Sequence, residues 1–200
     1  MILNDFVGSN NEVQSLYDWL HDFYNGIKQT NYVFIVGNSG NGKSLLSELL
    51  AKELEADLFR IQPFSVENKN DLNNFIKSVN IDPLDHKRKL ILVDDIDDYH
   101  FRYKDVLFSI PEISRFPVIY TSKIFNLPQE MKSGSLKSPK KKWFFKLNKP
   151  RTSQLLKFLK TKKSNISDNE LKIIAKESKS VRSAVLTLRN KSINRLVSQE

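Results

Sequence analysis

A glycine-rich string that ends in lysine and serine carries the clearest chemistry in this sequence. Residues 37–44, GNSGNGKS, match the pattern G-x-x-x-x-G-K-[ST] completely. Glycines let backbone N–H groups curl around phosphate oxygens, the Lys43 ammonium neutralises phosphate charge, and the Ser44 hydroxyl is a ligand for Mg²⁺. The string therefore predicts a phosphate-binding loop. The residues expected to contact a nucleotide here are Gly37, Asn38, Ser39, Gly40, Asn41, Gly42, Lys43, Ser44 and Leu45.

Two adjacent acids follow a second apolar run, LILVDD, about 50 residues after Ser44. In a protein with a phosphate-binding loop, an acid at this place holds the metal and its hydration shell, and we assign that role to Asp94. Asp95 is then placed to orient or deprotonate an attacking water. Asp97 and Asp98 are interpreted as surface or helix-start residues. The alternative is that the whole acidic string is a solvated turn.

The apolar spacing predicts the elements that must position these residues. Continuous apolar runs predict strands, and apolar residues spaced three and four apart predict helices. The expected strands are Tyr32–Gly37, Leu58–Ile61, Lys89–Val93, Pro117–Thr121 and Trp143–Leu147, the last of them buried. The expected helices are Asn10–Tyr24, Lys43–Leu54, Asp71–Val79, Tyr103–Ile110 (stopped by Pro111), Thr152–Thr161, Asp168–Glu177 and Ser180–Val197.

Strands that alternate with helices favour an α/β fold with a parallel sheet covered by helices on both faces. Beyond Pro150 the pattern is entirely helical, and Pro150 is a plausible hinge. We therefore predict a nucleotide-binding α/β domain over residues 1–148 and a small three-helix lid domain over residues 149–200.

The composition excludes several classes of protein. The 200 residues contain no cysteine, which excludes a disulfide scaffold, a thiolate zinc site and a cysteine nucleophile. No apolar run approaches the length of a membrane span, and the N-terminus lacks the pattern of a secretory signal. We expect an intracellular protein, in the cytoplasm, nucleoid or nucleus, with no membrane partner.

The formal net charge of +9 is distributed unevenly: residues 1–100 carry −7 and residues 101–200 carry +16. A basic half favours a polyanionic partner. The segment 132–151 holds much of this charge, with aromatic residues beside it, and suggests sequence-independent contact with a DNA backbone. Its basic residues are Lys132, Lys137, Lys140, Lys141, Lys142, Lys146, Lys149 and Arg151. The alternative is a solvated lysine-rich loop.

In combination these motifs resemble an AAA+ ATPase, and within that group a clamp-loader subunit of the replication factor C type, closest to the large subunit. The resemblance is carried by ordered segments across nearly the whole chain. Besides the two motifs above, they are the N-terminal box Asn4–Leu20, the sensor 1 region Phe116–Pro128, the strand before the lid Trp143–Pro150, and the sensor 2 helix Ser178–Asn190.

The resemblance implies the fold of a P-loop NTPase, with ATP and Mg²⁺ bound between sheet and lid. Val7 and Gly8 match the pair that lines the adenine pocket, and Arg182 matches the sensor 2 arginine that contacts the γ-phosphate. Lys43, Asp95 and Arg182 become the expected catalytic residues, and Ser44 and Asp94 the expected metal site. The implied function is a clamp-loader-like ATPase of DNA replication that remodels a DNA-associated partner, with other AAA+ subunits or a sliding clamp as further partners.

Several positions depart from the family pattern. Asp95 stands where the family has Glu, and Lys123 stands where sensor 1 has Asn, with Thr121 and Ser122 as polar neighbours, so hydrolysis is expected to be slow. The stretch Lys140–Lys142 replaces the Ser-Arg-Cys finger of small subunits, which favours the large-subunit reading. The resemblance ends before a C-terminal collar domain. Two alternatives stay open: a helicase- or initiator-loading AAA+ protein, and a nucleotide-dependent scaffold with little hydrolysis.

Overall fold

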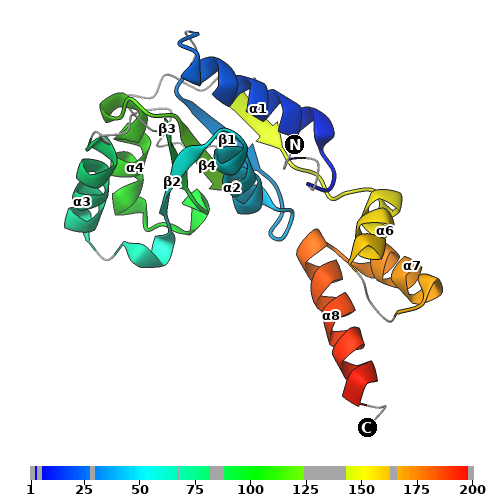
Figure 1. Cartoon of the computed structure of the whole chain (residues 1–200). Coiled ribbons are helices and arrows are strands. Elements are labelled where there is room, and N and C mark those ends of the chain that lie inside the picture. Colours follow the sequence, from blue (N-terminus) through cyan, green and yellow to red (C-terminus); the bar gives the residue numbers. More distant parts are fainter. Residues whose placement is uncertain are drawn as a thin grey trace.

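The computed structural model describes residues 3, 6–27, 30–66, 68–81, 88–123, 143–162 and 166–197. Its centre is a five-stranded parallel sheet in the order β2-β3-β4-β1-β5 (Figure 1). The strands are β1 (Tyr32–Val36), β2 (Ala56–Ile61), β3 (Arg88–Val93), β4 (Val118–Ser122) and β5 (Phe144–Lys146). Because β4 lies between β1 and β3, the residues that follow these three strands meet at one edge of the sheet.

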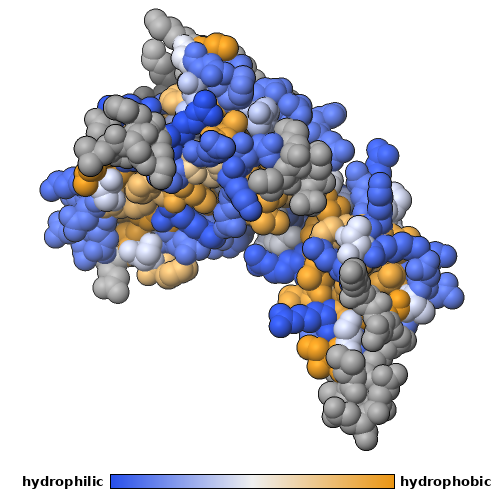
Figure 2. Space-filling view, viewed as in Figure 1, coloured by the Kyte–Doolittle hydropathy of each residue, from blue (hydrophilic) through white to orange (hydrophobic). Residues whose placement is uncertain are grey.

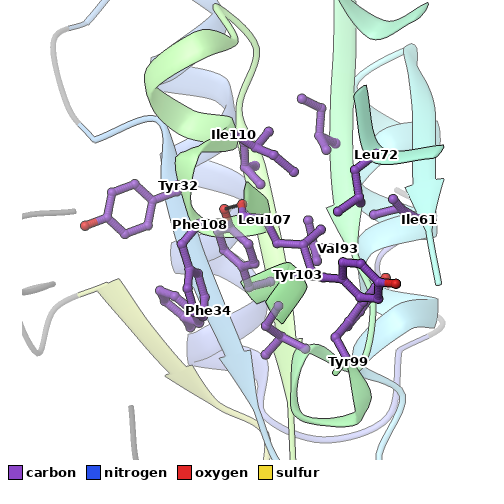
Figure 3. Close-up of a cluster of buried hydrophobic side chains, with 14 of the residues drawn as sticks. Tyr32, Phe34, Ile61, Leu72, Val93, Tyr99, Tyr103, Leu107, Phe108 and Ile110 are labelled. Atoms are coloured by element: carbon purple, nitrogen blue, oxygen red, sulfur yellow. Dashed lines mark hydrogen bonds between the residues drawn. The ribbon is translucent and has the colours of Figure 1, made fainter. Parts of the chain in front are cut away.

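Helices cover both faces of the sheet, as the sequence predicts. Helices α1 (Asn10–Tyr24) and α2 (Lys43–Glu53) pack on one face, over Val33, Ile35, Leu90 and Leu92. Helices α3 (Lys69–Asn80) and α4 (Phe101–Ile113) cover the other face, where Phe34, Val93 and Leu107 are buried (Figure 3). Two short 3₁₀ helices, η2 (Pro63–Ser65) and η3 (Ile96–Asp98), follow β2 and β3.

The alternation of side chains along the strands explains this two-sided burial. Neighbouring residues of a strand point to opposite faces, so a strand buried on both sides must be apolar throughout. All five residues of β1 and of β4 are buried, as are five of the six residues of β3. The continuous apolar runs of the sequence therefore place β1, β3 and β4 in the centre of the sheet.

Three helices follow β5 and form what we call the lid: α6 (Thr152–Thr161), α7 (Asp168–Glu177) and α8 (Val181–Val197). They enclose a hydrophobic cluster of their own, which includes Leu155, Leu159, Ile174 and Leu188. At the start of α7, the Ser167 hydroxyl and backbone N–H both donate to Glu170. The lid projects from one end of the sheet, and apolar residues gather where the two meet (Figure 2).

Pro111 does not stop α4, contrary to the sequence-based expectation, because the helix continues to Ile113 with this proline inside it. A proline has no N–H, so the carbonyl of Leu107, four residues earlier, loses its helical donor. The buried Tyr120 hydroxyl donates to this carbonyl instead, at 2.7 Å. A side chain from β4 thus replaces the missing helical hydrogen bond.

The expectation of a buried strand at Trp143–Leu147 is also wrong in part. Strand β5 forms, but Phe144 and Phe145 are only half-buried and Lys146 is exposed. The reason is position: in the described sheet β5 is an edge strand that pairs with β1 alone. Phe144 contacts one core and Phe145 the other, so each ring keeps one side open.

The proline in α4 leads to a stability prediction. We expect Tyr120→Phe to lower the free energy of unfolding by about 1–3 kcal/mol, because it leaves the buried Leu107 carbonyl without a donor. Urea unfolding followed by circular dichroism measures the change. Pro111→Ala restores an N–H at the required position, so it should recover part of the loss in the Tyr120→Phe background. An equal loss in both backgrounds would contradict the explanation.

Candidate nucleotide-binding site

The glycine-rich string forms a loop between β1 and α2 at the carboxyl edge of the sheet. The Gly37 N–H donates to the Ser122 carbonyl at 3.1 Å, which continues the pairing of β1 with β4. Gly40 and Gly42 have φ angles of +81° and +87°, values that residues with a Cβ rarely adopt. Helix α2 begins at Lys43, so its N-terminal N–H groups face the loop. This geometry fits the phosphate-binding loop that the sequence predicts.

Glycine is also required at position 37 by close packing. A Cβ on Gly37 would lie 2.5 Å from the Leu147 carbonyl oxygen, immediately after β5. The Asn41 side-chain amide donates to the same carbonyl, at 3.2 Å. The loop is therefore held against the segment that leads from the sheet into the lid.

Lys43 lies inside the loop, with only 6% of its surface exposed. Its ammonium donates to the Gly37 carbonyl at 2.9 Å, so the side chain folds back over the loop. Burial lowers the pKa of Lys43, and the nearby Asp95 and Asp94 carboxylates oppose that effect without cancelling it. A phosphate would satisfy this buried cation better than one carbonyl does.

Three donors from three elements converge on the Asp94 carboxylate, of whose side chain only 4% is exposed. Ser44 of α2 donates to Oδ1 at 2.7 Å, and Thr121 of β4 donates to the same oxygen at 2.6 Å. Arg60 of β2 forms an ion pair with Oδ2. Burial raises the pKa of Asp94, but the hydrogen bonds from Thr121, Ser44 and Arg60 outweigh it and hold the pKa below its usual value.

The oxygen atoms of Ser44 and Asp94 suit a hard cation. Mg²⁺ prefers oxygen ligands and usually takes only one or two from the protein, the rest being water and phosphate. Among the described residues there is no cluster of three or more His, Cys, Asp or Glu side chains that could hold a metal by itself. A hydroxyl and an ionised carboxylate 2.7 Å apart beside a phosphate-binding loop fit a Mg²⁺ ion that arrives with a nucleotide.

Asp95 adopts a left-handed backbone conformation, with φ 46° and ψ 57°. Its N–H donates to Thr121 Oγ1 at 2.7 Å, so the Thr121 hydroxyl links the two adjacent acids. Burial raises the pKa of Asp95, and the neighbouring Asp94 raises it further, while Lys43 lowers it. A carboxylate with a raised pKa is a stronger base, which suits a group that takes a proton from water.

A cavity of about 430 Å³ extends from the loop to the lid. Several residues expected to contact nucleotide line it: Val7, Gly40, Asn41, Gly42, Leu45 and Arg182. Phe6, Leu49, Phe158, Lys162, Val181, Val185 and Leu186 complete its lining. The wall is apolar toward α8 and polar at the loop, as expected for a pocket that takes a base at one end and phosphates at the other.

Gly8 lies outside this lining, in the adjoining cavity of about 490 Å³ that shares Phe6, Val7, Phe158 and Lys162 with it. A Cβ on Gly8 would lie 3.1 Å from the Pro150 side chain. The structure therefore places Val7 in the candidate base pocket and Gly8 against the proline where the lid begins.

The lid contacts the loop directly at the start of α8. The Arg182 N–H donates to the Gly40 carbonyl at 3.2 Å, and a Cβ on Gly40 would lie 2.6 Å from Ser180 Oγ. Arg182 is also one of the residues that line the cavity. Asn38 and Ser39, the loop residues before Gly40, are exposed.

The residues after β4 and β3 form a second polar group beside the two acids. Ser122 donates to both oxygens of Asp97, each at 3.0 Å, and the Lys123 N–H also donates to Asp97. The Lys123 ammonium pairs with Asp98, and the hydrogen bond that it donates to this carboxylate raises the pKa of Lys123. Asp97 lies in the first turn of η3, in agreement with the helix-start interpretation, and it also links η3 to β4.

Most of the lysine-rich segment lies outside the described residues, since 124–142 are not among them. Lys146, Lys149 and Arg151 are described, and all three are exposed. No helix in the described parts of the chain has the length and hydropathy that a membrane crossing requires.

Sequence reasoning missed two residues of the acid cluster and several of the cavity. Arg60 lies on a half-buried strand, where an arginine reads as an ordinary surface residue. Thr121 was noted only as a polar neighbour of Lys123, yet its hydroxyl joins Asp94 to Asp95. Phe6 lies near the N-terminus, whereas Phe158 and Lys162 belong to α6 and its C-terminal end, so only the fold brings Phe6 to the other two.

The sequence is similar to several characterised families. Residues 18–101 match the family model "Novel STAND NTPase 3". The replication factor C large subunit of Methanococcus maripaludis (strain C7) is 31% identical over 96 residues, 48% of this chain and 20% of that protein. A RuvB subunit of the Holliday junction branch migration complex, from Anaplasma phagocytophilum, is 24% identical over 111 residues, 56% of this chain and 32% of that protein. The matched region is thus about a fifth of the length of the first relative.

Solved structures show the same fold over nearly the whole chain. A structure described as "Structural Basis for Katanin Self-Assembly" has a TM-score of 0.76 at 18% identity, covering 97% of this chain and 71% of that one. The Thermotoga maritima RuvB Holliday junction branch migration motor has a TM-score of 0.67 at 18% identity, covering 94% and 62%. The chain therefore has the AAA+ fold, and its sequence is related to replication factor C large subunits and RuvB.

The opposite pKa shifts of the two adjacent acids predict opposite effects on stability. A carboxyl group with a lowered folded-state pKa, such as Asp94, contributes stability at pH values above its unfolded-state pKa of about 3.9. This contribution is lost as the pH falls through the folded-state pKa. A carboxyl group with a raised folded-state pKa, such as Asp95, contributes stability at pH values below about 3.9. This contribution is lost as the pH rises through the folded-state pKa. At pH 7 we therefore expect Asp94→Asn to lower the free energy of unfolding and Asp95→Asn to raise it.

Urea unfolding in EDTA, repeated from neutral to acid pH, measures both differences. Each difference in the free energy of unfolding between variant and wild type should shrink as the pH falls, because the protonated aspartic acid of wild type is then neutral like the asparagine of the variant. Asp57→Asn, on the exposed side of β2, controls for the loss of one surface charge. Differences of the same sign for the two variants at pH 7 would contradict the assignment.

Proposed function

We propose that this chain is an ATPase that binds ATP·Mg²⁺ between the sheet and the lid, and that it acts as a clamp-loader-like AAA+ protein of DNA replication. The observation that carries the proposal is the Ser44–Asp94 hydrogen bond of 2.7 Å beside the phosphate-binding loop, next to a cavity that ends at Arg182. The similarity to replication factor C large subunits and to RuvB supports a DNA-associated role.

Each expected site residue has a defined task in this proposal. The backbone of Gly37–Gly42 and the Lys43 ammonium hold the phosphates, while Ser44 and Asp94 hold Mg²⁺, which would neutralise charge on the transferred phosphoryl group. Val7 and Leu45 flank the base. Asp95, whose pKa is raised, accepts a proton from the attacking water.

The contact between lid and loop is the means by which nucleotide could move the lid. The Arg182 N–H donates to the Gly40 carbonyl, and Arg182 is part of the cavity lining. A γ-phosphate would attract this guanidinium, whereas the shorter ADP would leave it without an ionic partner. The position of the lid would then differ between the ATP and ADP states, and a bound partner would be remodelled.

A nucleotide-dependent scaffold with little hydrolysis is the second candidate. Two observations favour it: Asp95 is one methylene shorter than the Glu of the family pattern, and the position of the sensor 1 Asn is held by Lys123, which is paired with Asp98. The match to a STAND NTPase model over residues 18–101 is equally consistent with it. A helicase- or initiator-loading role is the third reading, and it differs only in the partner.

Three variants test the nucleotide site. We expect Lys43→Ala to weaken ATP binding at least about tenfold, since it removes a charge-assisted contact with phosphate. Asp95→Asn should keep the affinity and lower hydrolysis about 100-fold, the effect of losing a general base. Asp95→Glu should raise hydrolysis, because the longer side chain reaches the water. Fluorescent-nucleotide titration and phosphate release under single-turnover conditions, with primed DNA present, measure these effects.

The same experiment separates the candidate functions. If wild type hydrolyses ATP no faster than Asp95→Asn while binding is lost in Lys43→Ala, the motor proposal fails and the scaffold remains. Arg182→Ala should reduce the preference for ATP over ADP. Arg189→Ala, an exposed arginine two turns further along α8, is its matched control and should leave that preference unchanged.

Contact with DNA is proposed through the lysine-rich segment. Replacing Lys140, Lys141 and Lys142 by Gln should weaken DNA binding and reduce the slope of log K against log salt by about 0.7–0.9 per lost phosphate contact. Fluorescence anisotropy with primed DNA at several salt concentrations measures the slope. Lys52→Gln, an exposed lysine on α2, is the control. An unchanged slope in the triple variant would exclude these lysines as DNA contacts.

A further inference from the structure

Arg60 is a charged residue that contacts the expected metal site and that the proposed function does not use. It lies on β2, and its guanidinium bridges two carboxylates: Nη2 pairs with Asp94 Oδ2, and Nη1 lies 3.0 Å from Glu48 Oε1. Asp94 is almost completely buried, whereas Glu48 is 44% exposed and Arg60 is 33% exposed. One end of this bridge is therefore inside the site and the other faces solvent.

The Asp94 carboxylate already has three donors, and they differ in charge. The Ser44 and Thr121 hydroxyls, both on Oδ1, are neutral and can turn a lone pair toward a cation. Arg60, on Oδ2, is a permanent cation and cannot accept. A Mg²⁺ ion drawn to Asp94 would therefore meet a positive charge that is bound to the same carboxylate.

Glu48 is a second carboxylate that can hold the Arg60 guanidinium. It lies on α2, four residues after Ser44, so both side chains project from the same face of the helix. Arg60 can keep its bond to Glu48 while it releases Asp94, which requires a rotation of its flexible side chain and no backbone movement. A buried carboxylate without a cation is costly, so Arg60 also satisfies Asp94 when no metal is bound.

We propose that Arg60 is a built-in counter-ion of Asp94 that competes with Mg²⁺, and that Glu48 receives its guanidinium when the metal binds. Arg60 thereby sets the metal concentration at which nucleotide is bound productively, and it is a positioning residue that acts through Asp94. The inference rests on the proposed ATP·Mg²⁺ site and adds the residue that controls its metal affinity.

The test is a Mg²⁺ titration of fluorescent-ATP binding by the full chain. Arg60→Met keeps the bulk of the side chain without its charge, and we expect it to lower the half-saturating Mg²⁺ concentration about tenfold, equivalent to about 1.4 kcal/mol. Arg60→Lys retains a cation and should stay close to wild type. Glu48→Gln removes the alternative partner and should raise the half-saturating concentration. Arg189→Met is the matched control and should not change it.

Each result either supports or overturns the competition. A higher half-saturating concentration in Arg60→Met would mean that Arg60 orients Asp94 for the metal, and an unchanged one would mean that the ion pair is structural; both overturn the inference. If Arg60→Met fails to fold, as judged by circular dichroism, an unchanged or lower value in Glu48→Gln overturns it.

Affinity for ATP in EDTA provides a readout that does not depend on the metal. It should be the same for Glu48→Gln and wild type, since Glu48 acts only through the competition, and a large change there would contradict the inference. No binding of ATP by wild type, with or without Mg²⁺, would overturn the proposed function itself. Binding with an unchanged Mg²⁺ dependence across the variants overturns only the role of Arg60.

Discussion

The need to satisfy one buried carboxylate organises the carboxyl edge of the sheet in this protein. Asp94 directly follows β3, in an environment where an unpaired charge would be strongly destabilising, and its donors come from α2, β4 and β2. Because these three elements must each present one side chain to the same group, the order of strands in the sheet and the start of α2 are fixed relative to one another. The requirement to supply donors to Asp94 therefore constrains both the electrostatics of the site and the topology of the fold.

The fold was largely predictable because the signals for it are local. Continuous apolar runs marked β1, β3 and β4, and the spacing of Val13, Leu16 and Leu20 marked α1. The errors arose where tertiary contacts override a local rule. Pro111 remains inside α4 because Tyr120, from a neighbouring strand, supplies the missing donor, and β5 is half-exposed because it lies at the edge of the described sheet.

Residues of the candidate site could be predicted only where they belong to a motif of consecutive residues. The loop from Gly37 to Ser44 and the Asp94–Asp95 pair could be read from the sequence, and the structure brings Ser44 to Asp94. Arg60 and Thr121 have no such signature, since each acts through a contact between strands 27 or more residues apart. Pairing of parallel strands, which no motif encodes, selects these partners.

The lid meets the phosphate-binding loop through two main-chain atoms, the Arg182 N–H and the Gly40 carbonyl. The hydrogen bond itself involves no side chain, but the close approach of Ser180 leaves no room for a Cβ at position 40. The docking of the lid therefore depends on where α8 begins and on the absence of a side chain at position 40.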